Sequence, residues 1–445
     1  MNPNFFKSKS YSCLDMVRSI ACQVLIENKP ADRIVASYFK MNKKFGSKDR
    51  KFLYEVVFSF FRWLGWTRYL LKENMPGLKL DFSAVHDKIL IQLILSSALL
   101  DNIKEREIIL YWMEELEVSP SFLRDFENAK SLKDKASLFR GILRFFGVHK
   151  EIHNSALIPE WAYDKFPADA PKDKFIEYCQ IRPPIWLRVQ VKDTTFLLKE
   201  FAENNIKYRF HDTVKNAICI INASQSIYNL ESFTKGFFEI QDIGSQVIGL
   251  VASPKPGQRW WDCCAGAGGK TLQLSSIMDN KGKIVASDIR EYKLDDLKKR
   301  ARRDEKSNIE CRVWDGDSLR KKKTQSFDGV LVDSPCSCSG TWRRNPDAKW
   351  HTEFSEIEEL SKIQGNIIRN VASAVKSGGV LVYATCSFFE EENFGVVKAF
   401  LADNLDFKLD PFLNPLNGIQ TEGFLQIYPW DADCDSMFVA RLIKN

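Results

Sequence analysis

Residues 258–270 read Gln-Arg-Trp-Trp-Asp-Cys-Cys-Ala-Gly-Ala-Gly-Gly-Lys. A short apolar run ends at Asp262, three glycines follow, and residues 270–277 have the composition of a helix. The pattern predicts a strand, a glycine turn and a helix start. Glycines in such a turn let a ligand approach the backbone closely, and the free N–H groups of the helix favour an acceptor-rich or anionic group. The turn is not a P-loop, because no glycine stands at the required distance before Gly-Lys-Thr.

Around this turn, residues 237–445 alternate between strand and helix patterns. Strands are expected at 259–262, 283–287, 309–313, 328–333 and 379–384, and an antiparallel pair at 405–410 and 436–442. Such alternation is typical of a doubly wound, mostly parallel α/β sheet, so a Rossmann-like domain is predicted over 237–445.

The first 150 residues carry a different pattern. Apolar residues recur at helical spacing, and helices are expected across 11–150, which predicts an all-α domain over 1–150 with Trp63 and Trp66 in its core. Residues 151–236 are expected to form a connector and then a small α/β unit of the kind that often binds RNA. In that unit, strands are predicted at 186–191, 208–210 and 217–221 and a helix at 195–204.

Composition bounds the class of protein. The chain has 445 residues, 44% hydrophobic and 27% charged, which is typical of a soluble protein of several domains. Residues 1–160 hold 25 Lys and Arg against 19 Asp and Glu, and this is the whole of the net charge of +6, so a polyanion is a possible partner there. An ordinary basic surface accounts for the charge equally well. No signal peptide and no membrane-spanning run is found, and we expect a cytoplasmic monomer.

The eleven cysteines indicate reduced thiols rather than a disulfide framework. Cys336-Ser337-Cys338 lacks partner ligands at the spacing usual for zinc, so no metal is expected.

Polar residues follow four successive predicted strands, where ligands of such sheets bind. They are Asp288, Asp315, Asp333 and Cys386. Asp288 is placed to accept hydrogen bonds from a ribose diol, and Asp315 to meet an exocyclic amine of a purine. S-adenosylmethionine and NAD both satisfy this pattern, and the spacing does not separate them.

The cysteines near these strand ends favour a methyl donor. Cys336 follows Asp333 after two residues, and Cys386 ends the next strand. A thiolate can add to carbon 6 of a pyrimidine, which makes carbon 5 nucleophilic enough to attack a methyl sulfonium. An acid at the ring N3 would assist, and Asp333 stands at a suitable place. The alternative is that both cysteines are small buried hydrophobes, but Pro-Cys and Thr-Cys at neighbouring strand ends favour chemistry.

At these residues the chain resembles the RNA cytosine-5 methyltransferase family. The matching motifs are Glu-Ile-Gln-Asp-Ile-Gly-Ser-Gln (239–246), Cys-Ala-Gly-Ala-Gly-Gly-Lys-Thr (264–271), Ser-Asp-Ile-Arg-Glu (287–291), Asp-Ser-Pro-Cys-Ser-Cys-Ser-Gly-Thr (333–341), Arg-Arg-Asn-Pro-Asp-Ala-Lys-Trp (343–350) and Tyr-Ala-Thr-Cys-Ser (383–387). The likeness covers 180–445. The helical part resembles the domain related to antitermination factor NusB, and this pairing points to the bacterial 16S ribosomal RNA methyltransferase B type.

The resemblance implies a role for each matching residue. Cys386 is the nucleophile, Cys336 assists product release, and Asp333 and Lys270 lie near the reaction centre. The residues expected to bind S-adenosyl-L-methionine are Cys264, Ala265, Gly266, Ala267, Gly268, Gly269, Lys270, Asp288, Arg290, Asp315 and Asp333. Two departures, Gly266-Ala267 in place of the family's Ala-Pro and Asp435-Ser436-Met437-Phe438 in place of Asp-Gly-Phe-Phe, remove no catalytic group.

The sequence therefore predicts an enzyme that forms 5-methylcytosine in RNA, with ribosomal RNA, 16S above all, as partner. Methylation of transfer RNA is the rival within the class. A catalytically silent RNA-binding or ribosome-assembly factor is the rival outside it, and the two cysteines argue against it.

Overall fold

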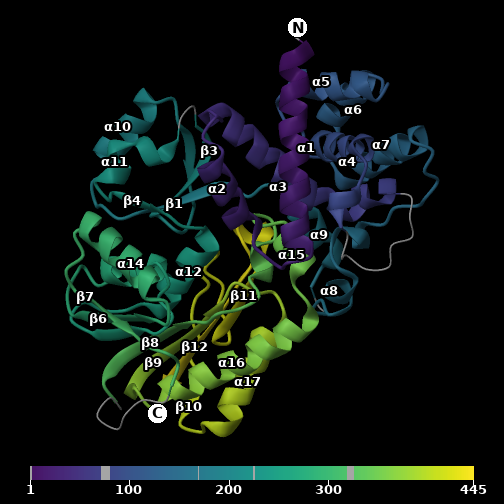
Figure 1. Cartoon of the computed structure of the whole chain (residues 1–445). Helices are drawn as coiled ribbons and strands as arrows, with labels where there is room; N and C mark the ends of the chain where they lie inside the picture. Colours follow the sequence, from purple (N-terminus) through teal and green to yellow (C-terminus); the bar gives the residue numbers. More distant parts are fainter. Residues whose placement is uncertain (1–2, 72–80, 169, 224–225, 318–324) are drawn as a thin grey trace. The chain divides into compact units, whose positions relative to one another are not determined.

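The computed structural model describes residues 3–71, 81–168, 170–223, 226–317 and 325–445 (Figure 1). The chain forms two compact units. The first consists of Met1–Arg182 and Trp342–Phe354, and the second of Pro183–Thr341 and Ser355–Asn445. The finer division into separately folding domains at 150/151 and 236/237 stays a prediction. Among the described residues, no helix combines the length and apolar content needed to cross a bilayer.

The first unit is helical throughout its described residues. Its α-helices are α1 (Pro3–Leu25), α2 (Ala31–Met41), α3 (Ser47–Thr67), α4 (Asp87–Leu100), α5 (Arg106–Glu115), α6 (Ser121–Asn128), α7 (Leu132–Phe145), α8 (Glu160–Asp164), α9 (Lys172–Cys179) and α15 (Ala348–His351). Helix α3 is central, since its last ten residues are all buried, and Trp63 and Trp66 are fully enclosed as the helical spacing predicted. The stretch expected to be a connector carries α8 and α9 and belongs to this unit.

Residues 342–354 complete the first unit from far along the sequence. Helix α2 begins after Pro30, whose side chain cannot cap it, and the carboxylate of Asp347 accepts the N–H of Ala31 at 2.8 Å instead. The indole Nε1 of Trp350 donates to the carbonyl of Phe61 at 2.6 Å. This segment therefore supplies both a helix cap and core side chains to the helical unit.

The second unit contains a small antiparallel sheet in the order β2-β3-β1-β4. Its elements follow one another as β1 (Ile185–Val189), α10 (Thr195–Glu203), β2 (Lys207–Phe210), β3 (Ala217–Asn222), α11 (Glu231–Thr234) and β4 (Phe238–Ile240). One face packs Leu187 and Ile218 against Leu197 and Phe201 of α10. The three strands expected from the sequence are present, and β4 is additional.

The opposite face of the small sheet is also covered. Trp186 and Cys219 project from it into a core that includes Val247 of α12 (Ile243–Ala252). Trp186 is 1% exposed. Base-stacking modules with four-stranded sheets use such a face for nucleic acid, but here protein side chains fill it.

The large sheet has the order β10-β12-β9-β8-β5-β6-β7, with β11 paired to β12 (Figure 1). Strands β5 to β9 pair in parallel, whereas β12 runs antiparallel to β9, β10 and β11. The strands are β5 (Arg259–Asp262), β6 (Lys283–Asp288), β7 (Ile309–Val313), β8 (Phe327–Asp333), β9 (Val375–Thr385), β10 (Phe407–Leu409), β11 (Phe424–Ile427) and β12 (Met437–Lys444). The doubly wound, mostly parallel sheet expected from the sequence is confirmed, including its antiparallel end.

Helices cover both faces of this sheet. They are α12, α13 (Gly269–Ile277) and α14 (Glu291–Arg303) on one side, and α16 (Phe354–Ala372) and α17 (Phe394–Asp403) on the other. Consecutive side chains of a strand point to opposite faces, so Trp260 packs with α12 and α13, while Trp261 packs with α16. Burial on both faces explains why the central strands contain unbroken apolar stretches, such as Trp260-Trp261 in β5 and residues 330–332 in β8.

Candidate active site

A cavity of about 1000 Å³ opens at the carboxyl ends of β5 to β9, all within the second unit. Its wall contains every site residue expected from the sequence except Gly268. Those residues are Cys264, Ala265, Gly266, Ala267, Gly269, Lys270, Asp288, Arg290, Asp315, Asp333, Cys336 and Cys386. Parallel strands bring their carboxyl ends to one edge, which is why residues up to 122 positions apart converge there.

The glycine turn forms the floor of this cavity. Gly266 has φ +53° and Gly268 has φ +89°, in the left-handed region that favours glycine. A Cβ on Gly268 would lie 2.1 Å from Cδ1 of Leu297, so this glycine lets α14 pack closely. A Cβ on Gly266 would meet no protein atom, because that position faces the cavity. The turn therefore offers bare backbone to a ligand.

Asp288 lies at the end of β6 and is 5% exposed. Its Oδ2 accepts the N–H of Gly266 at 2.9 Å, and its Oδ1 accepts the backbone N–H and the Nε of Arg290, both at 2.9 Å. Burial alone would raise the pKa of Asp288, but the hydrogen bonds from Arg290 and Gly266 outweigh it and lower the pKa. Asp288 is thus an ionised hydrogen-bond acceptor. A diol in the cavity would donate to the same carboxylate that accepts from Arg290.

Asp315 follows β7, the strand next to β6, and is an exposed residue of the cavity wall. Its Oδ1 accepts the N–H of Asp317 at 3.1 Å, which fixes the turn after β7. Its second carboxylate oxygen accepts none of the hydrogen bonds found among the described residues.

Lys270 and Asp333 form an ion pair in the wall of the cavity, with Nζ 2.8 Å from Oδ2. Burial opposes the charge of Lys270, but the carboxylate of Asp333 prevails and raises the lysine pKa. Burial also raises the pKa of Asp333, and Lys270 opposes that rise. A lysine that stays protonated therefore lies beside a carboxyl that takes up a proton more readily than a surface aspartate.

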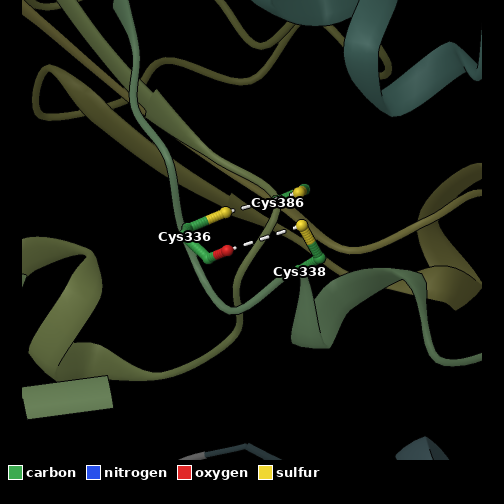
Figure 2. A group of neighbouring side chains, drawn as sticks. All are labelled: Cys336, Cys338 and Cys386. Atoms are coloured by element: carbon green, nitrogen blue, oxygen red, sulfur yellow. Dashed lines mark hydrogen bonds between the residues drawn. The ribbon is translucent and has the colours of Figure 1, made fainter. Parts of the chain in front are cut away.

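The two strand-end cysteines lie together. In the parallel pairing of β8 and β9, Asp333 is opposite Ala384, so Cys336 and Cys386 leave their strands side by side. Their Sγ atoms are 3.4 Å apart (Figure 2). Hydrogen bonds with the thiols of Cys336 and Cys338, and then burial, raise the pKa of Cys386.

Glu392 and Gln364, which the sequence analysis did not select, hold the cysteine loop in place. Glu392, fully buried, accepts the N–H and the hydroxyl of Ser337 at 2.8 and 2.6 Å. The amide of Gln364 donates to Glu392 and to the carbonyl of Pro335, each at 3.0 Å. Cys338 brings a third sulfur to the pair. The acidic run at 390–392, which follows β9 after four residues, was the available signal for Glu392, and the Cys-Ser-Cys spacing was the one for Cys338, whereas Gln364 carried none.

A further polar group lies beneath the turn. Asp262 is 1% exposed and accepts the hydroxyl of Thr271 at 2.6 Å. Burial raises its pKa to about 7. This contact joins the end of β5 to the first turn of α13, which stabilises the floor of the cavity.

Comparisons with known proteins agree on the kind of domain. Residues 249–443 match the family model described as 16S rRNA methyltransferase RsmB/F. The ribosomal RNA small subunit methyltransferase B of Serratia proteamaculans is 31% identical over 335 residues, covering 72% of this chain and 76% of the relative. The protein of the same name from Klebsiella pneumoniae is 27% identical over 96% of this chain and 98% of its own. The crystal structure of PH0851 matches with a TM-score of 0.73 and 23% identity, covering 97% of this chain and 99% of that one.

Proposed function

The chain belongs to the ribosomal RNA small subunit methyltransferase B family, and from this premise we propose that it forms 5-methylcytosine in small-subunit ribosomal RNA. The family confirms the resemblance found in the sequence and the use of S-adenosyl-L-methionine by an RNA methyltransferase. The choice of carbon 5 of cytosine and of a covalent route is the proposal. The observation that supports it is the pair of cysteine sulfurs, 3.4 Å apart, in one cavity with the Lys270–Asp333 pair.

S-adenosyl-L-methionine supplies an electrophilic methyl group when bound. The bare backbone at Gly266 suits its methionine part, together with Cys264, Ala265, Ala267, Gly268, Gly269 and Lys270. Asp288, oriented by Arg290, would accept from the ribose hydroxyls, and Asp315 from the adenine amine. The cavity volume of about 1000 Å³ leaves room for a nucleoside cofactor and a flipped base at once.

Cys386 would act on the base as a nucleophile. Its thiolate forms a bond to carbon 6 of cytosine, and the electron pair displaced from the ring double bond makes carbon 5 nucleophilic. Asp333, whose pKa burial raises, would donate a hydrogen bond to N3 and stabilise the charge that develops there. Lys270 holds Asp333 in that position.

Cys336 would complete the reaction. After methylation, a base must take the proton on carbon 5, the electron pair left behind re-forms the ring double bond, and the Cys386 sulfur leaves carbon 6 as a thiolate. Cys336 lies beside that bond and is the group we assign to product release. Glu392 and Gln364 would keep its loop in place during both steps.

The target base must leave its helical stack to enter the cavity, so other surfaces must hold the flanking RNA. We assign this to the helical unit, as a NusB-like domain, and to the small α/β unit, as an RRM-like module. Since the open face of the small sheet is filled by Trp186 and its neighbours, RNA would be bound there through phosphates and shape rather than by stacking on that face. A monomer in the cytoplasm suffices for this reaction.

The test is incubation of the full chain with S-adenosyl-L-methionine labelled in the methyl group and with 16S ribosomal RNA, free and in small subunits. Digestion to nucleosides should recover the label in 5-methylcytidine. Label in another nucleoside would contradict the proposed chemistry. If 5-methylcytidine is labelled only when transfer RNA is supplied, the substrate is transfer RNA and the proposed mechanism still holds.

A further inference from the structure

A third sulfur lies at the cysteine pair and has no part in the proposed reaction. The Sγ atoms of Cys336, Cys338 and Cys386 all lie within 4.8 Å of one another. They converge from two segments, the loop after β8 and the end of β9 (Figure 2). The sequence could not reveal this, because Cys386 is 48 residues beyond the Cys336-Ser337-Cys338 pair.

The backbone at Cys338 is unusual for its residue type. Its φ of +57° lies in the left-handed region, where a Cβ is crowded and glycine or asparagine is the ordinary choice. Its thiol donates to the carbonyl of Cys336 at 3.5 Å, so the side chain turns back toward the pair. A strained residue beside two reactive sulfurs is a reason to seek a function for its side chain.

The spacing of the sulfurs matches that of a metal-thiolate site. Zinc bonds to thiolates at about 2.3 Å, which places two ligands of a tetrahedral ion roughly 3.8 Å apart. The 3.4 Å between Cys336 and Cys386 and the upper bound of 4.8 Å for all three lie on either side of that value. Small side-chain rotations would therefore bring all three sulfurs to bonding distance of one ion.

We propose that Cys336, Cys338 and Cys386 form a three-thiolate site for a thiophilic divalent cation, Zn²⁺, which withholds Cys386 from the RNA base. Soft sulfur ligands select such ions, and three protein ligands leave a fourth position open. Binding forms three Zn–S bonds and releases to solvent the protons that the thiols still carry, with no electron transfer. The effect on catalysis rests on the proposed function, in which Cys386 is the nucleophile. The metal site itself is independent of that function.

The binding test uses the reduced, metal-free full chain. ZnCl₂ is titrated in competition with a chromophoric chelator, and CoCl₂ serves as a spectroscopic probe. The site predicts one tightly bound ion per chain and an intense thiolate-to-cobalt charge-transfer absorption. Absence of that absorption would overturn the proposal.

Cys338→Asn is the discriminating variant, because asparagine tolerates the left-handed backbone and removes only the third sulfur. Affinity for Zn²⁺ should fall by about tenfold or more, as expected for the loss of a metal ligand. Cys311→Ser, in β7 and outside the cavity, is the matched control and should bind Zn²⁺ as the parent chain does. Equal affinity in the parent chain and Cys338→Asn would overturn the site.

The consequence for catalysis is measured separately. One equivalent of Zn²⁺ should inhibit methyl transfer by the parent chain, a chelator should restore it, and Cys338→Asn should resist the inhibition. Zn²⁺ binding that depends on Cys338 supports the metal site even if no RNA is methylated. In that case the proposed function is wrong and the metal site stands. Methylation that proceeds unchanged while Zn²⁺ is bound would overturn the withholding of Cys386.

Discussion

Cys386 directly follows β9, and its sulfur faces that of Cys336 across 3.4 Å, so both thiols can act in turn on one pyrimidine ring. We predict that Cys386→Ala lowers methyl transfer by roughly three orders of magnitude or more, since no other group forms the bond to carbon 6. Affinity for RNA should persist, because the change removes a single atom. Labelled methyl transfer and filter binding measure the two effects.

Cys311→Ala is the control for this variant, as another partly buried cysteine outside the cavity. Unchanged turnover in Cys386→Ala would remove the nucleophile assignment.

Cys336→Ala should behave differently, because it leaves the nucleophile in place and removes the group assigned to release. The bond between Cys386 and carbon 6 should then persist after methylation. When the variant is incubated with 16S ribosomal RNA and the methyl donor, a protein–RNA adduct stable to sodium dodecyl sulfate should accumulate. It should be visible as a shifted band on a gel. A variant that turns over normally and forms no adduct would contradict the release role.

Among single residues, those at strand ends could be predicted from the sequence. Asp288 and Asp333 directly end buried strands, so the parallel sheet alone brings them to one edge. Cys338 and Gln364 could not be predicted. Their positions depend on how a loop and a helix cross the sheet edge, which no local pattern determines.

At the scale of elements, the register between β8 and β9 positions the chemistry. After β8 and the loop that carries Cys336, the chain makes a short 3₁₀ turn, η6 (Ser339–Thr341). There the N–H of Gly340 donates to the carbonyl of Cys386 at 2.9 Å. A Cβ on Gly340 would lie 2.1 Å from the carbonyl oxygen of Ser436 and 2.9 Å from that of Cys386. The turn thus links the loop that carries Cys336 to β9 and to the residue before β12.

Gly340→Ala should displace this turn, because backbone atoms on two sides leave no room for a methyl group. We expect a loss of roughly 1–3 kcal/mol in the free energy of unfolding, typical of overpacking, and a fall in turnover that exceeds any loss of cofactor affinity. Urea unfolding and labelled methyl transfer measure these. Gly46→Ala is the control, since its Cβ would come no closer than 3.8 Å to another residue. An active, fully stable Gly340→Ala would contradict this account of the loop.

Burial, more than length, decided which strands could be recognised in the sequence. Strands β5, β6 and β8 each contain a run of buried apolar residues because helices cover both faces, and that burial made them recognisable. Strands β4 and β11 were not expected. They have three and four residues, and three of the four in β11 are only partly buried, so their sequences carry little strand signal.

At the scale of the whole molecule, the 342–354 segment places a titratable amine inside the helical unit. Lys349 is fully buried, with its Nζ donating to the carbonyl of Arg62 at 3.1 Å. Burial lowers its pKa from 10.5 to about 7. Between these values the unfolded chain binds more protons than the folded one, so this lysine makes stability rise with pH over that window.

Lys349→Met should remove that contribution. The gain in the free energy of unfolding between pH 7 and pH 9.5 should be smaller in the variant, by at most about 3 kcal/mol. Urea denaturation followed by helical circular dichroism measures it at both pH values. Lys133→Met, at an exposed position of α7, should leave the pH dependence unchanged. If the free energy of unfolding rises equally with pH in Lys349→Met and in the parent chain, Lys349 stays charged when folded.

The membership of residues 342–354 in the helical unit could not be predicted. Their motif identified them with the methyltransferase part, and their helical period is only one turn long. Only the contacts with α2 and α3, formed across more than 280 positions of sequence, reveal it.

This discontinuity has a consequence for biosynthesis. The guanidinium of Arg62 lies in the interior of the helical unit and donates to the carbonyl of Arg343 at 2.8 Å, and α2 has its cap only from Asp347. A nascent chain of 182 residues lacks both partners. Residues 1–182 therefore leave the ribosome before the rest of the helical unit, which stays unfinished until residue 354 has also left it, by which time the glycine turn and β8 are already outside.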